Sequence, residues 1–476
     1  MVWIGLLFYP SLAMAHGTIS MDGSQFPLWF AFPFVGFLAC LALMPILAGK
    51  LWHAHYGKVI FIWILIAIGM MGSMVEYDDI LHGVGTTFWH QYFPFLCLIG
   101  SLFIISGGVH ISTRGKSSPS VNTGIIALGV VLANLIGTTG ASMLLIRPLI
   151  RLNKYRRYNT HIVIFFIFLV ANIGGCLTPI GDPPLFLGFL SGISFFWTLQ
   201  NLWQIFLTAV LPLLAIFWLI DRFFFYHDSK VIDPAHLHPD AKIKITGKRN
   251  LWLLGMVVLA VIASGLINDH HKINLFGVNV EVFDLMRDFT LIGLGILSLK
   301  ITPVSIHKSN EFSWKPLQEV ILIFAAIFVT ILPVSAMLDA GTNGAFEPVI
   351  RLANPSGVPH SLFYFWLTGF LSAFLDNAPT YLIFFHMAGG NPEQLMGSMS
   401  VTLAAISTAS VLMGALTYIG NAPNFMIKSI ADHMGVKMPG FIGYMAWSFM
   451  VLMPLFLLLS WLYFCEESNA FKLLNF

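Results

Sequence analysis

The sequence is poor in charged residues. Of its 476 residues, 10% are Asp, Glu, Lys or Arg, whereas 57% are Ala, Val, Ile, Leu, Met, Phe, Trp, Tyr or Cys. A soluble domain has about 25% charged residues, so this chain has too few polar side chains to cover a globule in water. The same composition excludes a disordered chain, which combines low hydrophobicity with high net charge. We therefore expect an all-α polytopic membrane protein.

Cysteine is scarce as well. The sequence has four cysteines, far apart and without a Cys-x-x-Cys motif: Cys40, Cys97, Cys176 and Cys465. This spacing argues against a structural zinc site or a thiol redox centre, so we expect packing residues. The formal net charge of +2 gives no reason to expect a nucleic-acid partner.

The chain begins with a short apolar segment. Residues 1–15 are too few to span a bilayer and end in Ala13-Met14-Ala15. A short apolar core followed by a small-x-small site is typical of a signal peptide, although the usual basic start is missing. The alternative is a retained apolar arm. In both cases we expect the following segment to start outside the cytoplasm.

Apolar runs recur along the chain. A bilayer core about 30 Å thick takes roughly 20 residues of helix. Full-length candidates are residues 28–49, 59–74, 93–109, 202–220, 251–267, 320–338 and 441–462, and a shorter run at 289–299 would gain length from its flanks. Four further regions are apolar but interrupted by Gly, Pro and polar residues: 123–150, 162–197, 362–387 and 399–430.

Basic residues indicate how these segments cross the membrane, because Lys and Arg collect on the cytoplasmic side. With an external start, 20 of the 24 Lys and Arg fall inside, and the others are Lys272, Arg287, Arg351 and Lys472. This count requires residues 123–150 to enter and leave on the cytoplasmic side. They are therefore predicted to form a re-entrant hairpin, and residues 362–387 a second one that enters from outside.

The interrupted regions contain an internal repeat. Residues 175–184 (GCLTPIGDPP) align with residues 414–423 (GALTYIGNAP), with Gly, Leu, Thr, Ile, Gly and Pro in register, and the same offset aligns Gly137 with Asp376. Because the two hairpins enter from opposite sides, we predict inverted repeats at residues 27–226 and 251–465, joined by a cytoplasmic linker at residues 227–250. Each repeat has three spans, a re-entrant hairpin, a broken helix (162–197 or 399–430) and a last span.

Inverted repeats with broken helices are typical of secondary transporters, which bind their substrates and coupling ions where the helices break. Short oxygen-bearing side chains gather at these breaks and are predicted to bind ions or substrate: Thr138, Thr139, Ser142, Thr178, Asp182, Asp376, Asn377, Thr380, Thr417, Asn421 and Asn424. Such oxygens suit small, hard cations. The alternative for the Thr and Asn residues is that they satisfy loose backbone groups.

Asp182 and Asp376 stand out, because an ionisable residue at membrane depth indicates function. A carboxylate that holds either a proton or a cation exchanges one for the other, so both residues are predicted to carry protons. The structural alternatives are a helix cap for Asp182, just before Pro183, and a turn residue at the hairpin tip for Asp376.

At these motifs the sequence resembles the ion transporter superfamily of elevator-type secondary transporters. This group includes NhaD-type sodium/proton antiporters, citrate and dicarboxylate transporters and arsenite permeases. The resemblance covers the architecture after residue 25, and its motifs lie at residues 137–142, 175–184, 376–380 and 414–424. It implies a homodimer, a transport layer that slides past a scaffold layer, and a Na⁺ site at Asn377, Thr380 and Thr417 with contributions from Thr138 and Thr139.

The hairpin tips distinguish branches of this superfamily. Dicarboxylate members carry Ser-Asn-Thr at both tips, whereas the tips here read GTTGAS at residues 137–142 and DNAPT at residues 376–380. The Asp376-Asn377 pair is more similar to the antiporter branch. That branch usually has an acidic residue or Asn in its first tip, which this chain lacks.

These observations predict a sodium/proton antiporter of the bacterial inner membrane, with lipid, Na⁺ and protons as its partners, no other cofactor and no enzymatic activity. The alternative is a Na⁺- or H⁺-coupled citrate or dicarboxylate symporter. Two acidic groups without a nearby Lys or Arg disfavour a bound anion. A remote alternative is an intramembrane aspartyl protease, in which two Asp residues share a proton.

Overall fold

The computed structural model describes residues 21–113, 117–228, 243–267, 271–357 and 359–465. The segment predicted as a signal peptide or arm, residues 1–15, lies outside the described residues. So do Lys472 and residues 229–242, which make up most of the predicted linker.

The described chain is an all-α polytopic membrane protein. Seven of its helical segments are long and apolar enough to cross a membrane, and up to eight if α12 (Lys315–Thr330) and α13 (Leu332–Asp339) form one bent span. The seven are Leu28–Pro45, Ala54–Met71, Tyr77–Gly107, Pro119–Leu152, Phe195–Asp228, Arg249–Leu266 and Phe441–Phe464. Two short antiparallel ribbons pair β1 (His110–Thr113) with β2 (Ile243–Thr246) and β3 (Lys272–Leu275) with β4 (Val278–Glu281).

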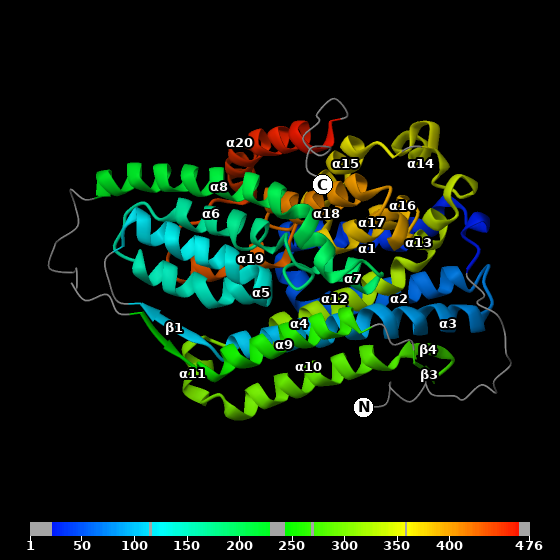
Figure 1. The fold of residues 1–476 in the computed structure, drawn as a ribbon, viewed down its shortest axis with the longest axis horizontal. Helices are drawn as coiled ribbons and strands as arrows, with labels where there is room; N and C mark the ends of the chain where they lie inside the picture. The colour runs from blue at the N-terminus through cyan, green and yellow to red at the C-terminus, as the bar shows by residue number, and fades with distance from the viewer. Residues whose placement is uncertain (1–20, 114–116, 229–242, 268–270, 358, 466–476) are drawn as a thin grey trace.

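The long helices run roughly along the long axis of the molecule in two layers (Figure 1). The support layer consists of α1 (Phe32–Leu47), α2 (Gly49–Met71), α3 (Tyr77–Thr87), α4 (Phe93–Gly107), α9 (Arg249–Leu266), α10 (Val282–Ile301), α12 and α13. The hairpin layer consists of α5 (Pro119–Leu152), α6 (Thr160–Leu169), α7 (Pro183–Leu190), α8 (Phe195–Asp228), α15 (Ser361–Leu375), α16 (Asn377–Met387), α18 (Ser400–Met413), α19 (Ala422–His433) and α20 (Phe441–Leu459). Three short helices lie in connections: α11 (Val304–Ser309) follows α10, α14 (Glu347–Ala353) leads from α13 to α15, and α17 (Pro392–Met396) follows α16. The layers meet where α4 packs on α5 and α13 on α16.

Helix α5 folds back on itself at Gly137. This residue has φ 78° and ψ 154°, a conformation that glycine adopts most readily. Asn122, near the start of α5, and Asn153, just after its end, donate hydrogen bonds to one another at 3.0 and 2.9 Å. In a continuous helix their separation of 31 residues would place them about 46 Å apart. Helix α5 is therefore a hairpin of two antiparallel arms with its tip at Gly137.

Helices α15 and α16 form a second hairpin. Tyr364 Oη donates to the carbonyl oxygen of Met387 at 3.2 Å, so the two arms are antiparallel. The turn is at Asp376, whose φ of 76° and ψ of 144° nearly repeat those of Gly137. A non-glycine residue in such a region costs about 1–3 kcal/mol, so the surrounding contacts must hold Asp376 in place.

After each hairpin comes a segment in which the helix is broken. Helices α6 and α7 are separated by residues 170–182, and α18 and α19 by residues 414–421, and each break contains one short 3-10 turn, Ile173–Gly175 or Gly414–Leu416. Thr178 Oγ1 donates to the carbonyl oxygen of Asn134 at 2.6 Å. Thr417 Oγ1 donates to that of Ala373 at 2.5 Å. Each break is thus tied to its own hairpin by the same hydrogen bond at aligned positions.

The structure differs from the sequence-based boundaries in three places. The segment predicted at residues 162–197 ends earlier, because a turn through Gly192 (φ 96°) separates α7 from α8. The span predicted at residues 320–338 bends by 40° between α12 and α13, just before Pro333, whose ring disfavours a continuous helix. Helix α3 was not among the predicted spans, because the two acidic residues in its first turn interrupt the apolar pattern of the sequence. The short run at 289–299 does gain length, as α10.

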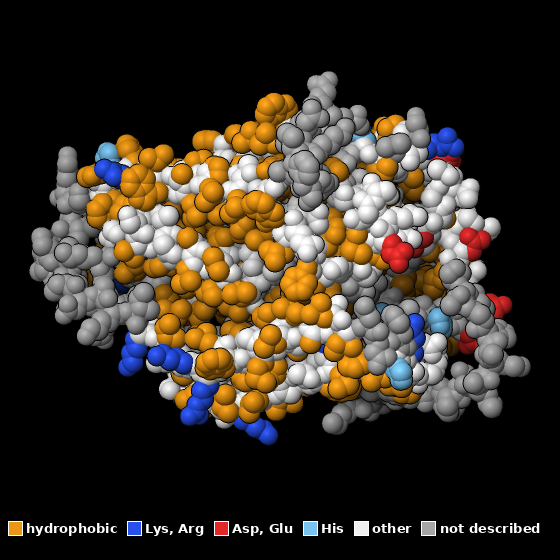
Figure 2. Space-filling view, viewed as in Figure 1, with side chains coloured by type: hydrophobic (Ala, Val, Ile, Leu, Met, Phe, Trp, Pro, Cys, Tyr) orange, Lys and Arg blue, Asp and Glu red, His pale blue; other side chains and the backbone are white. Residues whose placement is uncertain are grey.

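Basic and acidic side chains gather towards opposite ends of the long axis of the molecule. In Figure 2 the Lys and Arg side chains on this face gather mainly towards the left, and the Asp and Glu side chains lie towards the right. The left side carries β1, β2 and α11, and the right side β3, β4 and α14 (Figure 1). This separation agrees with a membrane whose cytoplasmic face is at the left. The orientation of the N-terminus stays a prediction.

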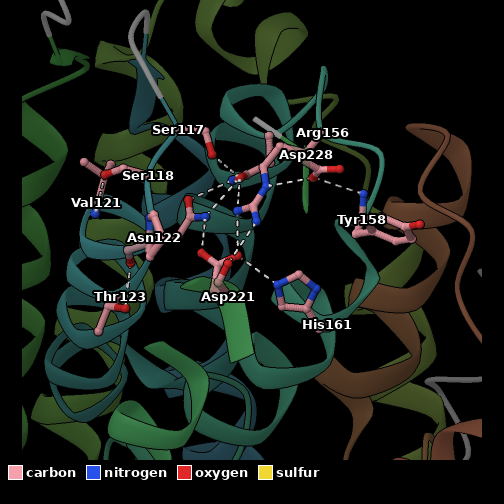
Figure 3. A network of polar contacts seen from close by, with 12 residues as sticks. Ser117, Ser118, Val121, Asn122, Thr123, Arg156, Tyr158, His161, Asp221 and Asp228 are labelled. Atoms are coloured by element: carbon pink, nitrogen blue, oxygen red, sulfur yellow. Dashed lines mark hydrogen bonds and ion pairs between the residues drawn. The ribbon is translucent and has the colours of Figure 1, made fainter. Parts of the chain in front are cut away.

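A buried polar network ties together the open end of the first hairpin (Figure 3). Arg156 Nη1 lies 2.5 Å from Asp221 Oδ1, and Arg156 Nε lies 3.6 Å from Asp228 Oδ2. His161 Nε2 lies 2.8 Å from Asp221 Oδ1, and Asn122 Nδ2 donates to Asp221 Oδ2 at 2.9 Å. The network joins α5, the start of α6 and the end of α8, away from water. It holds these elements as one unit.

Removing one partner of this network should destabilise the fold. Asp221→Ala takes the nearer carboxylate away from the buried Arg156 and leaves it only the longer contact with Asp228 (3.6 Å), which costs roughly 3 kcal/mol. We expect a clearly lower Tm of the purified protein in detergent. The matched control is Asp432→Ala, which removes an exposed ion pair with Lys428 (2.7 Å) and should cost at most about 1 kcal/mol. Equal losses of Tm in the two variants would contradict this interpretation.

Candidate functional site

Asp182 and Asn421 lie at the two helix breaks and contact each other. They are the residues just before α7 and α19, 239 positions apart in the sequence. Neither side chain caps its own helix, so the capping alternative for Asp182 is wrong. Instead, Asn421 Nδ2 donates to Asp182 at 3.2 Å (Oδ1) and 3.5 Å (Oδ2). The two breaks therefore meet side chain to side chain.

Both hairpin tips also reach Asp182. Thr138, at the first tip, donates its hydroxyl to Asp182 Oδ1 at 2.6 Å. Asn377, at the second tip, donates its side-chain amide to Asp182 Oδ2. These four side chains are each at most 2% exposed. The buried carboxylate of the first break is thus surrounded by donors from the two hairpin tips and the second break.

One acceptor in this cluster is left without a partner. Asn377 Oδ1 is buried and has no donor among the described residues, although the amide nitrogen of the same side chain binds Asp182. Within the same part of the chain, Ser142 Oγ, on the second arm of α5, is also buried without a partner. Unsatisfied buried polar atoms are uncommon and usually have a reason. A free amide oxygen beside a carboxylate is a suitable place for a cation or a proton donor.

Asp376 lies beside this cluster. It is half-buried, and its Oδ1 accepts from the backbone N–H of Asn377 at 2.7 Å. Its carbonyl oxygen accepts from the Thr380 hydroxyl at 2.7 Å. The role of a turn residue, one of the two interpretations of the sequence, is thus present in the structure. Asn377, the next residue, binds Asp182, so the turn places Asp376 beside the site and the two interpretations of Asp376 do not exclude one another.

Other residues that were predicted to bind ions or substrate form hydrogen bonds to backbone groups instead. The Thr417 hydroxyl donates to Ala373 and accepts from the N–H groups of Ile419 and Gly420, both at 3.1 Å. This uses all its hydrogen-bonding capacity and leaves no lone pair free for a cation. Asn424 Nδ2 donates at 2.9 Å to two carbonyl oxygens of its own break, those of Gly414 and Thr417. Thr178 and Thr380 likewise donate to backbone carbonyl groups.

Sequence reasoning missed Asn172. This fully buried residue of the first break donates to Asn424 Oδ1 of the second break at 2.7 Å and to the carbonyl oxygen of Ile167 at 2.8 Å. Asn421 Nδ2 lies 3.3 Å from its Oδ1. The sequence does contain a signal, since Asn172 is the one polar residue in the apolar stretch 161–175 after His161. It connects the two breaks independently of Asp182.

A small cavity opens beside Asp182. It has a volume of about 40 Å³ and lies between the first hairpin tip, the first break and α4. The polar part of its lining consists of Thr138, the half-buried Thr139 and Asp182. Its apolar lining includes Phe95 and Leu102 of α4. No Lys or Arg of the described chain lines it. Since one water needs roughly 10–15 Å³, the cavity has room for an ion or a few waters.

The comparison with known families agrees with this architecture. Residues 23–464 match the CitMHS_2 family, which is described as "Putative citrate transport". The chain belongs to this family. No curated protein matches the chain. As a member of CitMHS_2, the protein is a multi-pass membrane transporter, and its predicted relation to ion and citrate transporters is confirmed at this level. The bacterial inner membrane and the homodimer stay predictions.

In this CitMHS_2 protein the backbone at the two breaks is packed too closely to admit a Cβ atom at Gly181 or Gly420. A Cβ on Gly181 would lie 2.3 Å from the carbonyl oxygen of Gly175, and one on Gly420 would lie 2.6 Å from that of Gly414. Gly181→Ala and Gly420→Ala should each push a break out of place at a cost of about 1–3 kcal/mol, measured as a lower Tm in detergent. Gly255→Ala is the control, because its Cβ meets nothing within 4 Å. Unchanged Tm values in both break variants would disprove the described packing.

Proposed function

We propose that this transporter exchanges Na⁺ for H⁺, with Asp182 as the group that both ions share. The observation that carries this proposal is the surrounding of Asp182: a buried carboxylate with Thr138, Asn377 and Asn421 as donors and with no basic residue on the wall of its cavity. A charged group at this depth is costly unless a proton or a cation neutralises it. One site that accepts either ion, but not both, couples their movements.

The size of the cavity favours an inorganic ion. Its volume is about 40 Å³, whereas pockets for organic ligands usually have about 300–1,000 Å³. The free Oδ1 of Asn377 adds a neutral oxygen to the carboxylate oxygens of Asp182. Carboxylate, amide and hydroxyl oxygens are the ligands that small cations prefer. We therefore infer a Na⁺ site centred on Asp182 and Asn377, with Thr138 and Thr139 nearby and Asp376 as a second carrier of protons.

The repeated geometry supports alternating access. Gly137 and Asp376 share a backbone conformation, and Thr178 and Thr417 share a hydrogen bond, all at the same sequence offset. Two such units of opposite orientation are typical of transporters that expose one site to each side in turn. We propose that the hairpin layer carries the site past the support layer, as in an elevator.

The second candidate is a Na⁺- or H⁺-coupled citrate symporter, and the family description favours it. Here the ion site would be the same, and the citrate carboxylates would bind at the helix N-termini of α7 and α19, whose dipoles favour anions. The acidic groups at Asp182 and Asp376 oppose this candidate unless cations or protons neutralise them first. Proteolysis has little support, because both oxygens of Asp182 accept from Thr138, Asn377 and Asn421 and no described hydrogen bond joins it to Asp376.

Proteoliposomes with a lumenal pH dye distinguish these functions. With an imposed pH gradient, NaCl should collapse the gradient, choline chloride should not, and sodium citrate should act no faster than NaCl. Asp182→Asn keeps the size of the side chain but removes its charge, so exchange should fall to the background level. The control is Asp432→Asn, at an exposed ion pair outside the site, which should exchange normally.

Two results would overturn the proposal. One is a wild-type protein that ignores Na⁺ alone but accumulates labelled citrate under a Na⁺ or H⁺ gradient, which selects the symporter. The other is an Asp182→Asn protein that exchanges Na⁺ for H⁺ as fast as the wild type, which removes Asp182 from the exchange.

A further inference from the structure

Two ion pairs connect the hairpin layer to the support layer. Arg147 Nη2, on the second arm of α5, lies 3.4 Å from Glu311 Oε2, in the loop between α11 and α12. His386 Nδ1, on α16, lies 2.8 Å from Asp339 Oδ1, at the end of α13. Each pair thus joins the returning arm of a hairpin to an acidic residue of the other layer.

The two basic residues occupy aligned positions. His386 follows Arg147 by 239 residues, the offset that relates Asn421 to Asp182. Their acidic partners lie at opposite ends of the molecule, because α11, next to Glu311, is at the left in Figure 1 and α13, which ends at Asp339, is at the right. The two pairs therefore hold the hairpin layer near both membrane faces at once.

The support side of the first pair is firmly anchored. Asn310, next to Glu311, donates to the carbonyl oxygens of Gly107 and Val109 at 2.8 and 2.7 Å, and its Oδ1 lies 2.7 Å from His110 Nδ1. This fixes the loop to the end of α4 and to β1. Glu311 itself has a φ of 50°, in a region that costs a non-glycine residue free energy. The loop is thus held so that Glu311 points at the hairpin layer.

The hairpin side of this pair is poorly satisfied. The Arg147 side chain is 9% exposed, and its Nε and Nη1 have no hydrogen-bond partner in the part of the chain that the structure describes. The Glu311 side chain is 73% exposed, in contrast to the two buried carboxylates that bind Arg156. Its carboxylate returns to water when the contact opens, so this pair is weaker than a fully buried one and can separate and re-form.

We propose that Arg147–Glu311 and His386–Asp339 are latches that hold the hairpin layer at this position of its travel. This inference rests on the proposed movement of that layer. A slide along the membrane normal by more than the length of an ion pair breaks both contacts together. The latches then set how long the site near Asp182 stays at this position, although none of the four residues lines the cavity.

Reversible cross-linking tests this proposal directly. The double variants Arg147→Cys with Glu311→Cys and His386→Cys with Asp339→Cys are treated in proteoliposomes with a bifunctional methanethiosulfonate, which spans the space of the removed side chains that a direct disulfide would be too short to bridge. Each cross-link should stop transport, and its reduction should restore transport, whereas the four single variants should keep transporting in the presence of the reagent. Transport that continues at the same rate in fully cross-linked protein would overturn the proposal.

A second experiment does not depend on the transported substrate. A Thr139→Cys reporter lies in the cavity between the two layers and should become more accessible to a soluble thiol reagent when they separate. Arg147→Gln and Glu311→Gln should each raise its labelling rate about fivefold or more, and the double variant should match the single ones. The control is Glu347→Gln, which removes an ion pair with Arg351 (2.7 Å) within the single helix α14.

Together, the two experiments distinguish a failure of the latch proposal from a failure of the proposed function. Unchanged labelling in Arg147→Gln and Glu311→Gln would overturn the latch even if Na⁺/H⁺ exchange is confirmed. Raised labelling in a protein that moves neither Na⁺ nor citrate would support the latch and leave the proposed function without support.

Discussion

The structure depends on the need to satisfy a carboxylate that is buried between helices inside a membrane protein. Asp182 is 2% exposed, and a carboxylate in such a place requires donors for its oxygens. A regular helix has no free donors along its middle, so these donors come from side chains at irregular positions. Thr138 and Asn377 come from hairpin tips and Asn421 from a helix break. Two hairpins and two broken segments must therefore converge for the site to exist.

Each break creates a second requirement, because it frees backbone groups that water does not reach. Thr178 and Thr417 bond the carbonyl groups of the facing hairpin arms, and Asn424 bonds two carbonyl groups of its own break. Several of the Thr and Asn residues near Asp182 therefore maintain the breaks, and their hydrogen-bonding groups are used for that purpose. This division explains why eleven short polar side chains accompany a cavity that has room only for an ion or a few waters.

Much of this arrangement can be predicted from the sequence. The features that could not be predicted have physical reasons. The aligned motifs GCLTPIGDPP and GALTYIGNAP locate the breaks, since Gly and Pro disfavour helix wherever they occur. The repeat predicts a site where the helices break, and the structure brings Asp182 and Asn421 of the two breaks together there. The role of each polar residue cannot be predicted from the sequence, because a Thr at a break is the same residue whether its hydroxyl binds an ion or a carbonyl group. Asn172 was missed for a related reason: its partners, Asn421 and Asn424, are about 250 residues away in sequence and become neighbours only in three dimensions. Helix α3 was missed because its acidic first turn reads as a loop.

The aligned halves are not identical, and the difference is chemically important. Where the first break has Asp182, the second has Asn421, and the amide donates to the carboxylate. Two acids at these positions would repel each other, and two amides would carry no charge. The replacement of one acid by its amide thus produces a single ionisable group at the point where the halves meet. The hydrogen bonds that position this carboxylate are still supplied by both halves, by Thr138 from the first and by Asn377 and Asn421 from the second.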